Sequence, residues 1–422
     1  MSHILFLNNN LDKLFESFEK YFPYSFGYNT YLPIFKHLKN NFKCNHVLKS
    51  RFILNNFIQK YNSHNFKVLI YDTKYKKLKY RKIFFKQIEI VSDELYERLT
   101  IDNMKIRDFL IPNYEVDILN NKIHTINSPF VIEAFVSFIL SECVTNNEIQ
   151  HFPLYYGSFS HLEKDNKNKY TSYHNLAMEK ILNDFTYLAY DKSELKELSK
   201  MEKKYYENKD KESGEFIYKT NQYLIGYIFQ IIYSINFMWK KYNITHNDLH
   251  VNNIMYKETN IENMSYTVNR KKYVVPTDKK LIKIIDFGRA CANYKNIALN
   301  NSIFNKEGDC YNQYYFSENK DIHLKSIKPR PINDVIMFLN DINTRFDISD
   351  KPDIIDFCEK YLTDKDGNAF NFDNDSFDKY IYISSIDWKT HSLDKILQDK
   401  IFDRFVKKPI NRKLTRKKKR KK

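Results

Sequence analysis

The chain has 422 residues, of which 42% are hydrophobic and 16% aromatic, so it can bury a substantial core and is not wholly disordered. Its seven glycines are scattered, which excludes a glycine-rich phosphate loop of either standard spacing. The formal net charge is +16, but residues 407–422 contain eleven Lys or Arg and no acid, so the remainder carries only 16 − 11 = +5.

The first half of the chain contains three segments with clear patterns. Residues 1–60 are rich in Asn and Lys, and their apolar residues recur at helical spacing, which predicts a helical N-terminal extension. Residues 66–90 read as two strands joined by a polar turn, which predicts a β-hairpin. A Ser-Pro pair then predicts the start of a helix over residues 129–144, followed by a strand over residues 151–159.

A charged segment separates these elements from a long apolar helix. Residues 161–215 are predicted to be a solvated insertion, with an exposed helix around residues 193–207. Residues 221–242 are predicted to form a helix, and the stretch 220–239 contains no charged residue, which is long enough to span a bilayer. It does contain several amide and hydroxyl side chains, so we predict a buried helix and no transmembrane segment.

The five cysteines are odd in number and form no CxxC pair, which favours a reducing compartment over a disulfide scaffold or a cysteine-rich zinc site. The N-terminal residues lack the basic and apolar regions of a secretory signal. We therefore expect a cytoplasmic location. The basic C-terminal residues are compatible with a nuclear signal or with an anionic partner such as nucleic acid or an acidic membrane face, and equally with a solvated, disordered end that has no specific partner.

The first motif with a chemical meaning lies in residues 244–256, where His246, Asp248 and Asn253 form the pattern H-x-D-x-x-x-x-N. In phosphoryl transfer, a carboxylate must accept or orient the proton of the attacking hydroxyl, and an amide oxygen can help to hold Mg²⁺. The step from Asp248 to Asn253 forms a loop that returns the chain. We therefore expect both side chains to face one cleft.

The second motif ends an apolar strand, where residues 281–290 contain Asp286, Phe287 and Gly288 in succession. Hard cations prefer oxygen ligands, so a carboxylate at Asp286 suits Mg²⁺ held against nucleotide phosphates. Gly288 is predicted to permit the backbone turn that aims this carboxylate at the metal.

Together, the two motifs resemble the catalytic loop and the DFG segment of the protein-kinase-like superfamily, in the order and after the kind of helix typical of that family. The resemblance implies an α+β, bilobal fold, with a small β-rich N-lobe, a larger α-helical C-lobe and ATP in the cleft between them. It implies that Asp248 orients the substrate hydroxyl and His246 braces the loop, while Asn253 and Asp286 hold Mg²⁺ (or Mn²⁺).

The resemblance also implies a division of the chain into an N-terminal extension, a kinase-like domain and a basic disordered tail, at residues 1–60, 61–405 and 406–422. Within the domain, the predicted parts are an N-lobe at about 61–160, the charged insertion at about 161–215 and a C-lobe at about 216–405.

In the predicted hairpin, Lys86 resembles the strand lysine that binds the ATP phosphates in this family, and Lys82 on the same face is the alternative. Phe84 stands where the family usually has a small residue under the adenine. The partner of the lysine is expected on the helix over residues 129–144, where Glu133 and Glu142 lie nine residues apart and so on opposite faces. We choose Glu133, because the helix continues for two turns beyond it.

Two further segments have family counterparts. Residues 330–342 are predicted to form a helix whose Asp334 either binds the catalytic-loop backbone, as in the family, or caps its own helix. Without a glycine-rich loop, an ordinary turn at residues 61–65 is expected to cover the phosphates.

The departures from the family pattern shape the functional hypotheses. His250 replaces the usual lysine after the catalytic aspartate, no Ala-Pro-Glu triplet follows Asp286, and residues 264–276 are predicted to be an inserted hairpin. These departures are most similar to the divergent serine/threonine kinases of large cytoplasmic DNA viruses, which would place the protein in the host cytoplasm or the virion. The leading hypothesis is therefore an ATP-dependent serine/threonine protein kinase acting on a protein substrate. The alternatives are a small-molecule phosphotransferase of the same superfamily and a catalytically weak kinase-like scaffold.

Overall fold

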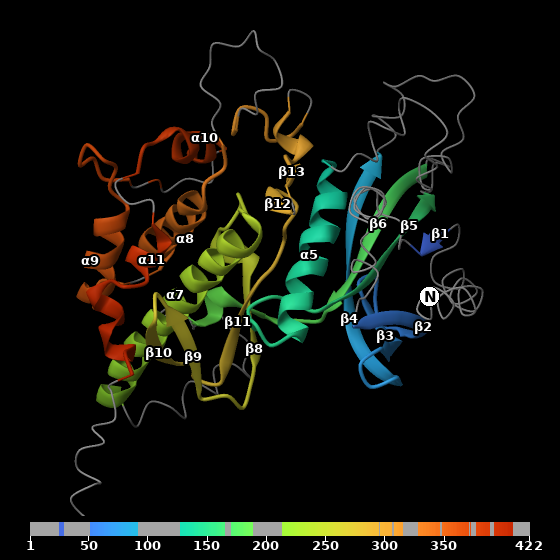
Figure 1. The fold of residues 1–422 in the computed structure, drawn as a ribbon, viewed down its shortest axis with the longest axis horizontal. Coiled ribbons are helices and arrows are strands. Elements are labelled where there is room, and N and C mark those ends of the chain that lie inside the picture. The colour runs from blue at the N-terminus through green and yellow to red at the C-terminus, as the bar shows by residue number, and fades with distance from the viewer. Residues whose placement is uncertain are drawn as a thin grey trace, which may run out of the picture.

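The structure is a computed structural model that combines a β-rich part containing one helix with a mainly helical part (Figure 1). The residues that it describes are 25–28, 51–91, 127–164, 170–188, 213–294, 296–305, 308–314, 328–346, 348–370, 372, 377–388 and 392–407.

The β-rich part is one antiparallel sheet with the strand order β1-β5-β6-β4-β3-β2. Its strands are β1 (Ser25–Tyr28), β2 (Phe52–Lys60), β3 (Asn65–Asp72), β4 (Lys77–Val91), β5 (Tyr155–Lys164) and β6 (Tyr170–Glu179). Alternate residues of β3 are buried, and Phe66 packs edge-on against Phe85 of β4 with ring centroids 4.9 Å apart. This alternation is what a sheet with one buried face requires. The hairpin predicted over residues 66–90 is confirmed as β3 and β4.

Helix α5 (Pro129–Thr145) lies between the sheet and the helical part (Figure 1). Proline at the first turn has a φ angle already suited to a helix, and the Ser128 carbonyl accepts from the Ile132 amide at 3.0 Å. Nearly all of its side chains are buried, because it packs on both sides. Phe138 contacts Tyr155 of the sheet, and Phe135 contacts Tyr294 of the helical part. The predicted helix over residues 129–144 is thus confirmed.

The C-terminal part begins with the long helix α7 (Ser213–Tyr242), which is buried along much of its length and confirms the helix predicted over residues 221–242. Its other helices are α8 (Pro331–Arg345), α9 (Pro352–Tyr361), α10 (Asp378–Ser385) and α11 (Leu393–Ile396). Short 3-10 helices are η2 (Phe185–Leu188), η5 (Val251–Asn253), η6 (Ser302–Phe304) and η7 (Lys400–Phe405). Its strands are β7 (Asn183–Asp184), β8 (Ile254–Glu258), β9 (Asn263–Val268), β10 (Lys271–Pro276), β11 (Lys280–Ile284), β12 (Ala292–Tyr294) and β13 (Ile297–Leu299).

The pairing of β8 with β11 brings the two motifs together. The strands are antiparallel, with Ile254 opposite Ile284. The chain before β8 and the chain after β11 therefore leave the same end of the ladder, and the Ile285 amide donates to the Asn253 carbonyl at 3.0 Å. The predicted hairpin at residues 264–276 is confirmed as β9 and β10.

The predicted helical extension over residues 1–60 is wrong where the structure describes it, because β1 and β2 are strands of the main sheet. The pairing of β2 with β3 shifts register between Leu54 and Asn56, and again between Phe57 and Gln59. The buried Leu54 and Phe57 consequently stand three residues apart, a spacing that imitates a helix.

The predicted insertion over residues 161–215 is wrong for residues 170–179, which form β6 between β5 and β4. Buried polar side chains at His174 and Asn175 break the apolar alternation by which a strand is recognised. The sheet therefore extends beyond both limits predicted for the N-lobe, from β1 to β6. The helix expected around residues 193–207 lies outside the described residues.

At the C-terminal end, Val406 forms an isolated bridge with Tyr273, and the Lys407 amide donates to the Lys272 carbonyl at 2.9 Å. The chain therefore contacts β10 as far as Lys407, and residues 408–422 lie outside the described residues. No helix in the part of the chain that the structure describes has the length and hydropathy needed to cross a membrane.

Candidate active site

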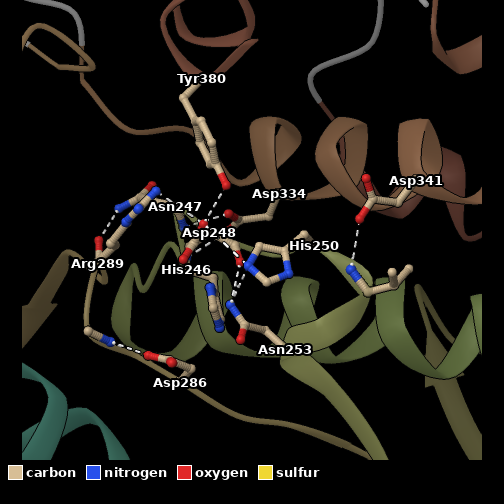
Figure 2. A network of polar contacts seen from close by, with 12 residues as sticks. His246, Asn247, Asp248, His250, Asn253, Asp286, Arg289, Asp334, Asp341 and Tyr380 are labelled. Atoms are coloured by element: carbon tan, nitrogen blue, oxygen red, sulfur yellow. Dashed lines mark hydrogen bonds and ion pairs between the residues drawn. The ribbon is translucent and has the colours of Figure 1, made fainter. Parts of the chain in front are cut away.

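The loop after α7 carries the first motif, and two buried carboxylates of α8 hold its backbone (Figure 2). The Asp334 carboxylate accepts from the amides of His246 and Asn247, at 2.8 and 2.7 Å. One side chain thus satisfies two consecutive loop amides. Its other expected role, capping its own helix, is not observed, because Arg330 is the N-cap and no side-chain capping bond forms there.

A second carboxylate of α8 extends this support along the loop. Asp341 lies seven residues, or almost two turns, after Asp334 and therefore on the same face of α8. It accepts from the Val251 amide at 2.9 Å. Burial raises the pKa of Asp334 to about 7, against the lowering effect of the two amides that it accepts.

Within the loop, Asp248 and Asn253 are tied to each other. The Asn253 side-chain amide donates to the Asp248 carbonyl at 2.8 Å and lies 3.2 Å from Nε2 of His250. The His246 ring donates from Nε2 to the Ile285 carbonyl at 2.8 Å, and this bond connects the loop to the segment that carries Asp286. The structure thus brings together the residues of both motifs, as Figure 2 shows.

The third group of predicted residues connects the sheet to this segment. Lys86 of β4 donates from Nζ to Oε1 of Glu133 on α5 and to Oδ1 of Asp286, both at 2.6 Å. The Glu133 side chain is buried, whereas that of Asp286 is 39% exposed. Of the two glutamates weighed for this pair, Glu133 is the one in contact with the lysine. Glu142 instead accepts from the Arg51 backbone amide at 3.3 Å.

The charges of this trio differ in their response to burial. Burial opposes the charge of Lys86, but the Glu133 and Asp286 carboxylates outweigh it and raise the lysine pKa. Burial by itself raises the pKa of both acids. At Asp286 the nearby positive charge of Lys86 outweighs burial, so the pKa of Asp286 is lowered. For Glu133 burial prevails and raises the pKa to about 7. Asp286 is therefore the acid that stays charged when one proton is added to the site.

The backbone turn at Asp286 differs from the prediction. Asp286 itself has a left-handed backbone, with φ of 64°, while Gly288 does not. Gly288 is required for space instead, because a Cβ there would lie 3.3 Å from both Oδ1 of Asp286 and Oε2 of Glu133. The glycine therefore allows two carboxylates to approach one backbone position.

The donor atoms fit a magnesium nucleotide better than a metal held by protein alone. Within the described ranges, no group of three or more His, Cys, Asp and Glu side chains is placed to hold a metal ion. Oδ2 of Asp286 and Oδ1 of Asn253, however, have no hydrogen-bond partner among the described residues. Two hard oxygen donors are what Mg²⁺ takes from a protein when substrate phosphates and water complete its coordination.

The turn expected to cover the phosphates joins β2 to β3. The carbonyl oxygen of the Asn62 side chain accepts from the amides of His64 and Asn65, at 3.0 and 2.8 Å. These two amides are therefore already hydrogen-bonded within the turn and are not free to bind phosphate. Phe84, two residues before Lys86 on β4, lies opposite Asn65 and is 37% exposed, with its ring centroid 5.7 Å from that of His64.

Sequence reasoning missed four of the residues labelled in Figure 2, which are Asn247, Asp341, Arg289 and Tyr380. The seven-residue step from Asp334 to Asp341 was a detectable signal, because it places both acids on one helix face. Arg289 directly follows the second motif but has no recognisable pattern. Tyr380 lies 132 residues after Asp248, and no local signal connects the two.

Comparison with solved structures finds a likeness to the "ROP18 kinase domain in complex with AMP-PNP and sucrose". The identity is 11%, the match covers 84% of this chain and 83% of that chain, and the TM-score is 0.35. No protein-family model matches the chain, and no curated protein matches it. At this TM-score the likeness carries no argument, and the roles of residues depend on the contacts described above.

The architecture agrees with the class predicted from the motifs. A β-rich lobe with one helix is joined to a mainly helical lobe, and the H-x-D-x-x-x-x-N loop and the Asp286 segment meet where the lobes contact each other. The predicted α+β class is confirmed, with a β-rich part beside a mainly helical part.

Proposed function

We propose that this protein transfers the γ-phosphoryl group of ATP, with Mg²⁺ or Mn²⁺, to serine or threonine hydroxyls of a protein substrate. The observation that carries the proposal is the pair of 2.6 Å bonds from Lys86 to Glu133 and to Asp286. These bonds join β4, α5 and the segment after β11. A lysine that bridges these three elements forms a charged site between the lobes, as phosphate binding requires.

Each residue has a role that suits its surroundings. Lys86, oriented by Glu133, binds the α- and β-phosphates, and the free oxygens of Asp286 and Asn253 bind the metal ion. The bound metal supplies the positive charge that offsets the charge developing on the phosphates. Asp248 accepts or orients the proton of the acceptor hydroxyl, and His246 holds the loop against Ile285.

The support from Asp334 and Asp341 favours a working site over a scaffold. Catalysis of phosphoryl transfer depends on positioning and charge stabilisation, so buried carboxylates that order the loop serve it directly. A scaffold without activity would not need Asp248, Asn253 and Asp286 to be held together where the two parts meet. The small-molecule alternative differs only in the acceptor. It is favoured by His250, whose Nε2 lies 3.8 Å from Oδ1 of Asp248, and by the missing Ala-Pro-Glu triplet.

We also propose that the protein acts in the cytoplasm, as expected for the viral kinases that its motifs resemble. Its basic tail at 406–422 would bind an anionic partner there, or direct the chain to the nucleus. The charge of residues 407–422 supports both roles of the tail, since eleven Lys or Arg have no acid among them.

The function is tested by incubating purified protein with γ-labelled ATP and Mg²⁺ or Mn²⁺, with generic protein substrates and with itself. Asp248→Asn is the matched control, because the amide keeps the shape of the side chain and removes its charge. Label on serine or threonine that disappears in the variant is the expected result. No transfer to protein, combined with a thermal shift by Mg-ATP, would favour a small-molecule acceptor. The absence of both would favour a scaffold.

A further inference from the structure

A closed cluster of three side chains surrounds the carboxylate of Asp248. Arg289 donates from its guanidinium to Oδ1 of Asp248 at 3.2 Å, and the Tyr380 hydroxyl donates to the same oxygen at 2.8 Å. The Arg289 guanidinium also lies over the Tyr380 ring, 5.0 Å from its centroid. Each of the three side chains therefore contacts the other two.

The cluster joins parts of the chain that are distant in sequence. Arg289 belongs to the segment after β11, and Tyr380 extends from α10 toward Asp248, as Figure 2 shows. Tyr380 is only 8% exposed, and the Asp248 side chain is 15% exposed. Burial, and next the Asp248 charge, raise the pKa of Tyr380, so its hydroxyl is protonated and donates the bond.

The two oxygens of the carboxylate have different surroundings. Oδ1 accepts both bonds and is also the atom nearest to His250, whereas Oδ2 has no hydrogen-bond partner among the described residues. A carboxylate held through one oxygen has a defined orientation. Its second oxygen remains available as an acceptor.

We propose that Tyr380 is a positioning residue, which together with Arg289 anchors Oδ1 of Asp248 and leaves Oδ2 to accept the proton of the substrate hydroxyl. This inference rests on the proposed function. It assigns a role in the reaction to α10, outside both motifs. The competing interpretation is that Tyr380 occupies the place of the acceptor hydroxyl and inhibits transfer.

Tyr380→Phe separates the two interpretations, because the variant keeps the ring over Arg289 and removes only the hydroxyl. Positioning predicts that kcat falls about tenfold or more while KM for ATP is unchanged, since Lys86, Glu133 and Asp286 are untouched. Tyr382→Phe removes a hydroxyl from the same helix at a half-exposed position, and it is the control expected to leave kcat unchanged.

Arg289→Gln is the second variant, and it keeps the test informative if Tyr380→Phe does not fold. It is expected to lower kcat with KM for ATP unchanged. Because both side chains act on one oxygen, the double variant should lose less than the product of the two single losses. Thermal midpoints of all variants show whether a loss of kcat reflects unfolding.

The outcomes distinguish this inference from the proposed function. If the wild type transfers phosphate and Tyr380→Phe matches or exceeds it, the positioning role is overturned while the proposed function stands. An increase would identify Tyr380 as an inhibitory contact. If the wild type transfers no phosphate to any acceptor, the proposed function fails and the positioning role fails with it.

Discussion

Gly288 lies at the point where the carboxylates of Asp286 and Glu133 approach the backbone most closely. A side chain there would have its Cβ 3.3 Å from an oxygen of each, which is tighter than an ordinary van der Waals contact. Both acids are bonded to Lys86, so a displacement of one disturbs the whole trio. The site thus depends on the absence of a side chain as well as on the charged groups present.

Gly288→Ala is expected to displace the two carboxylates by a few tenths of an ångström and to lower the transfer rate about tenfold. The thermal midpoint should change little, because the partly exposed Asp286 carboxylate can move. Gly226→Ala is the matched control, since its Cβ would meet the rigid Pro276 carbonyl at 2.9 Å. It should lower the midpoint while the rate per folded molecule is retained. The reverse pattern would contradict this account of Gly288.

Lys86→Met is expected to lower the transfer rate about a hundredfold or more, because the phosphates lose their cation. Above about pH 8, where a Glu133 with a pKa of about 7 is charged, it should also destabilise the fold by about 2–3 kcal/mol, since this buried carboxylate loses its charged partner. Adding Glu133→Gln should restore most of the stability and none of the activity. Kinetics and denaturant titrations of both variants check this. Equal stability of Lys86→Met and the wild type would mean that Glu133 has another partner in solution.

At the scale of elements, His151 connects the inserted hairpin to the strand that leads to the site. Its ring is buried, with Nδ1 2.9 Å from the Ile282 carbonyl of β11 and Nε2 2.8 Å from the Tyr266 hydroxyl of β9. Burial lowers the pKa of His151 to about 4. The folded protein therefore contains the neutral ring, although a histidine in the unfolded chain has a pKa of about 6.5.

This difference predicts that stability is lost on acidification. Between pH 6.5 and about 4 the unfolded chain binds a proton at His151 that the folded protein does not, so the free energy of unfolding falls as pH falls. The loss from this residue reaches about 3 kcal/mol. His151→Gln should remove this part of the pH dependence. The test measures the free energy of unfolding against pH for the wild type and the variant. Two parallel curves would contradict the prediction.

Over the whole molecule, the positive charge is concentrated in two regions. The tail at 407–422 carries +11, and residues 51–91 carry ten Lys or Arg and two acids, which is +8. The rest of the chain therefore carries 16 − 11 − 8 = −3. The sequence outside these two regions is thus mildly acidic, and any anionic partner should bind at one of the two basic regions.

Truncation after Lys407 tests the role of the tail. Truncation there keeps the contacts of Val406 and Lys407 with β10, so the thermal midpoint and the transfer rate should be unchanged. Affinity for a short single-stranded oligonucleotide should fall, and its dependence on salt should become weaker because fewer phosphates are neutralised. Unchanged affinity would indicate that residues 51–91 bind the anion, and this is checked by charge-reversing Lys67 and Lys82 on the open face of the sheet.

The sequence by itself determined the features that are encoded within short stretches. The two motifs, the hairpin of β3 and β4, and the helices α5 and α7 follow from spacing and local composition, because each forms mainly from contacts within a few residues. The motifs were sufficient to predict the fold class. Of the three residues that meet between the two parts, the motifs contain Asp286, while Lys86 and Glu133 were chosen through the family resemblance.

Only the tertiary structure decided the features that depend on distant partners. The choice of Glu133 over Glu142 depends on which face of α5 turns toward β4, and the bond from Tyr380 to Asp248 spans 132 residues. The central strand β6 and the bulged strand β2 are likewise specified by neighbours in the sheet, since their own sequences lack a clean alternation. Packing selects such partners among residues of similar chemistry, and no periodicity within one segment records that selection.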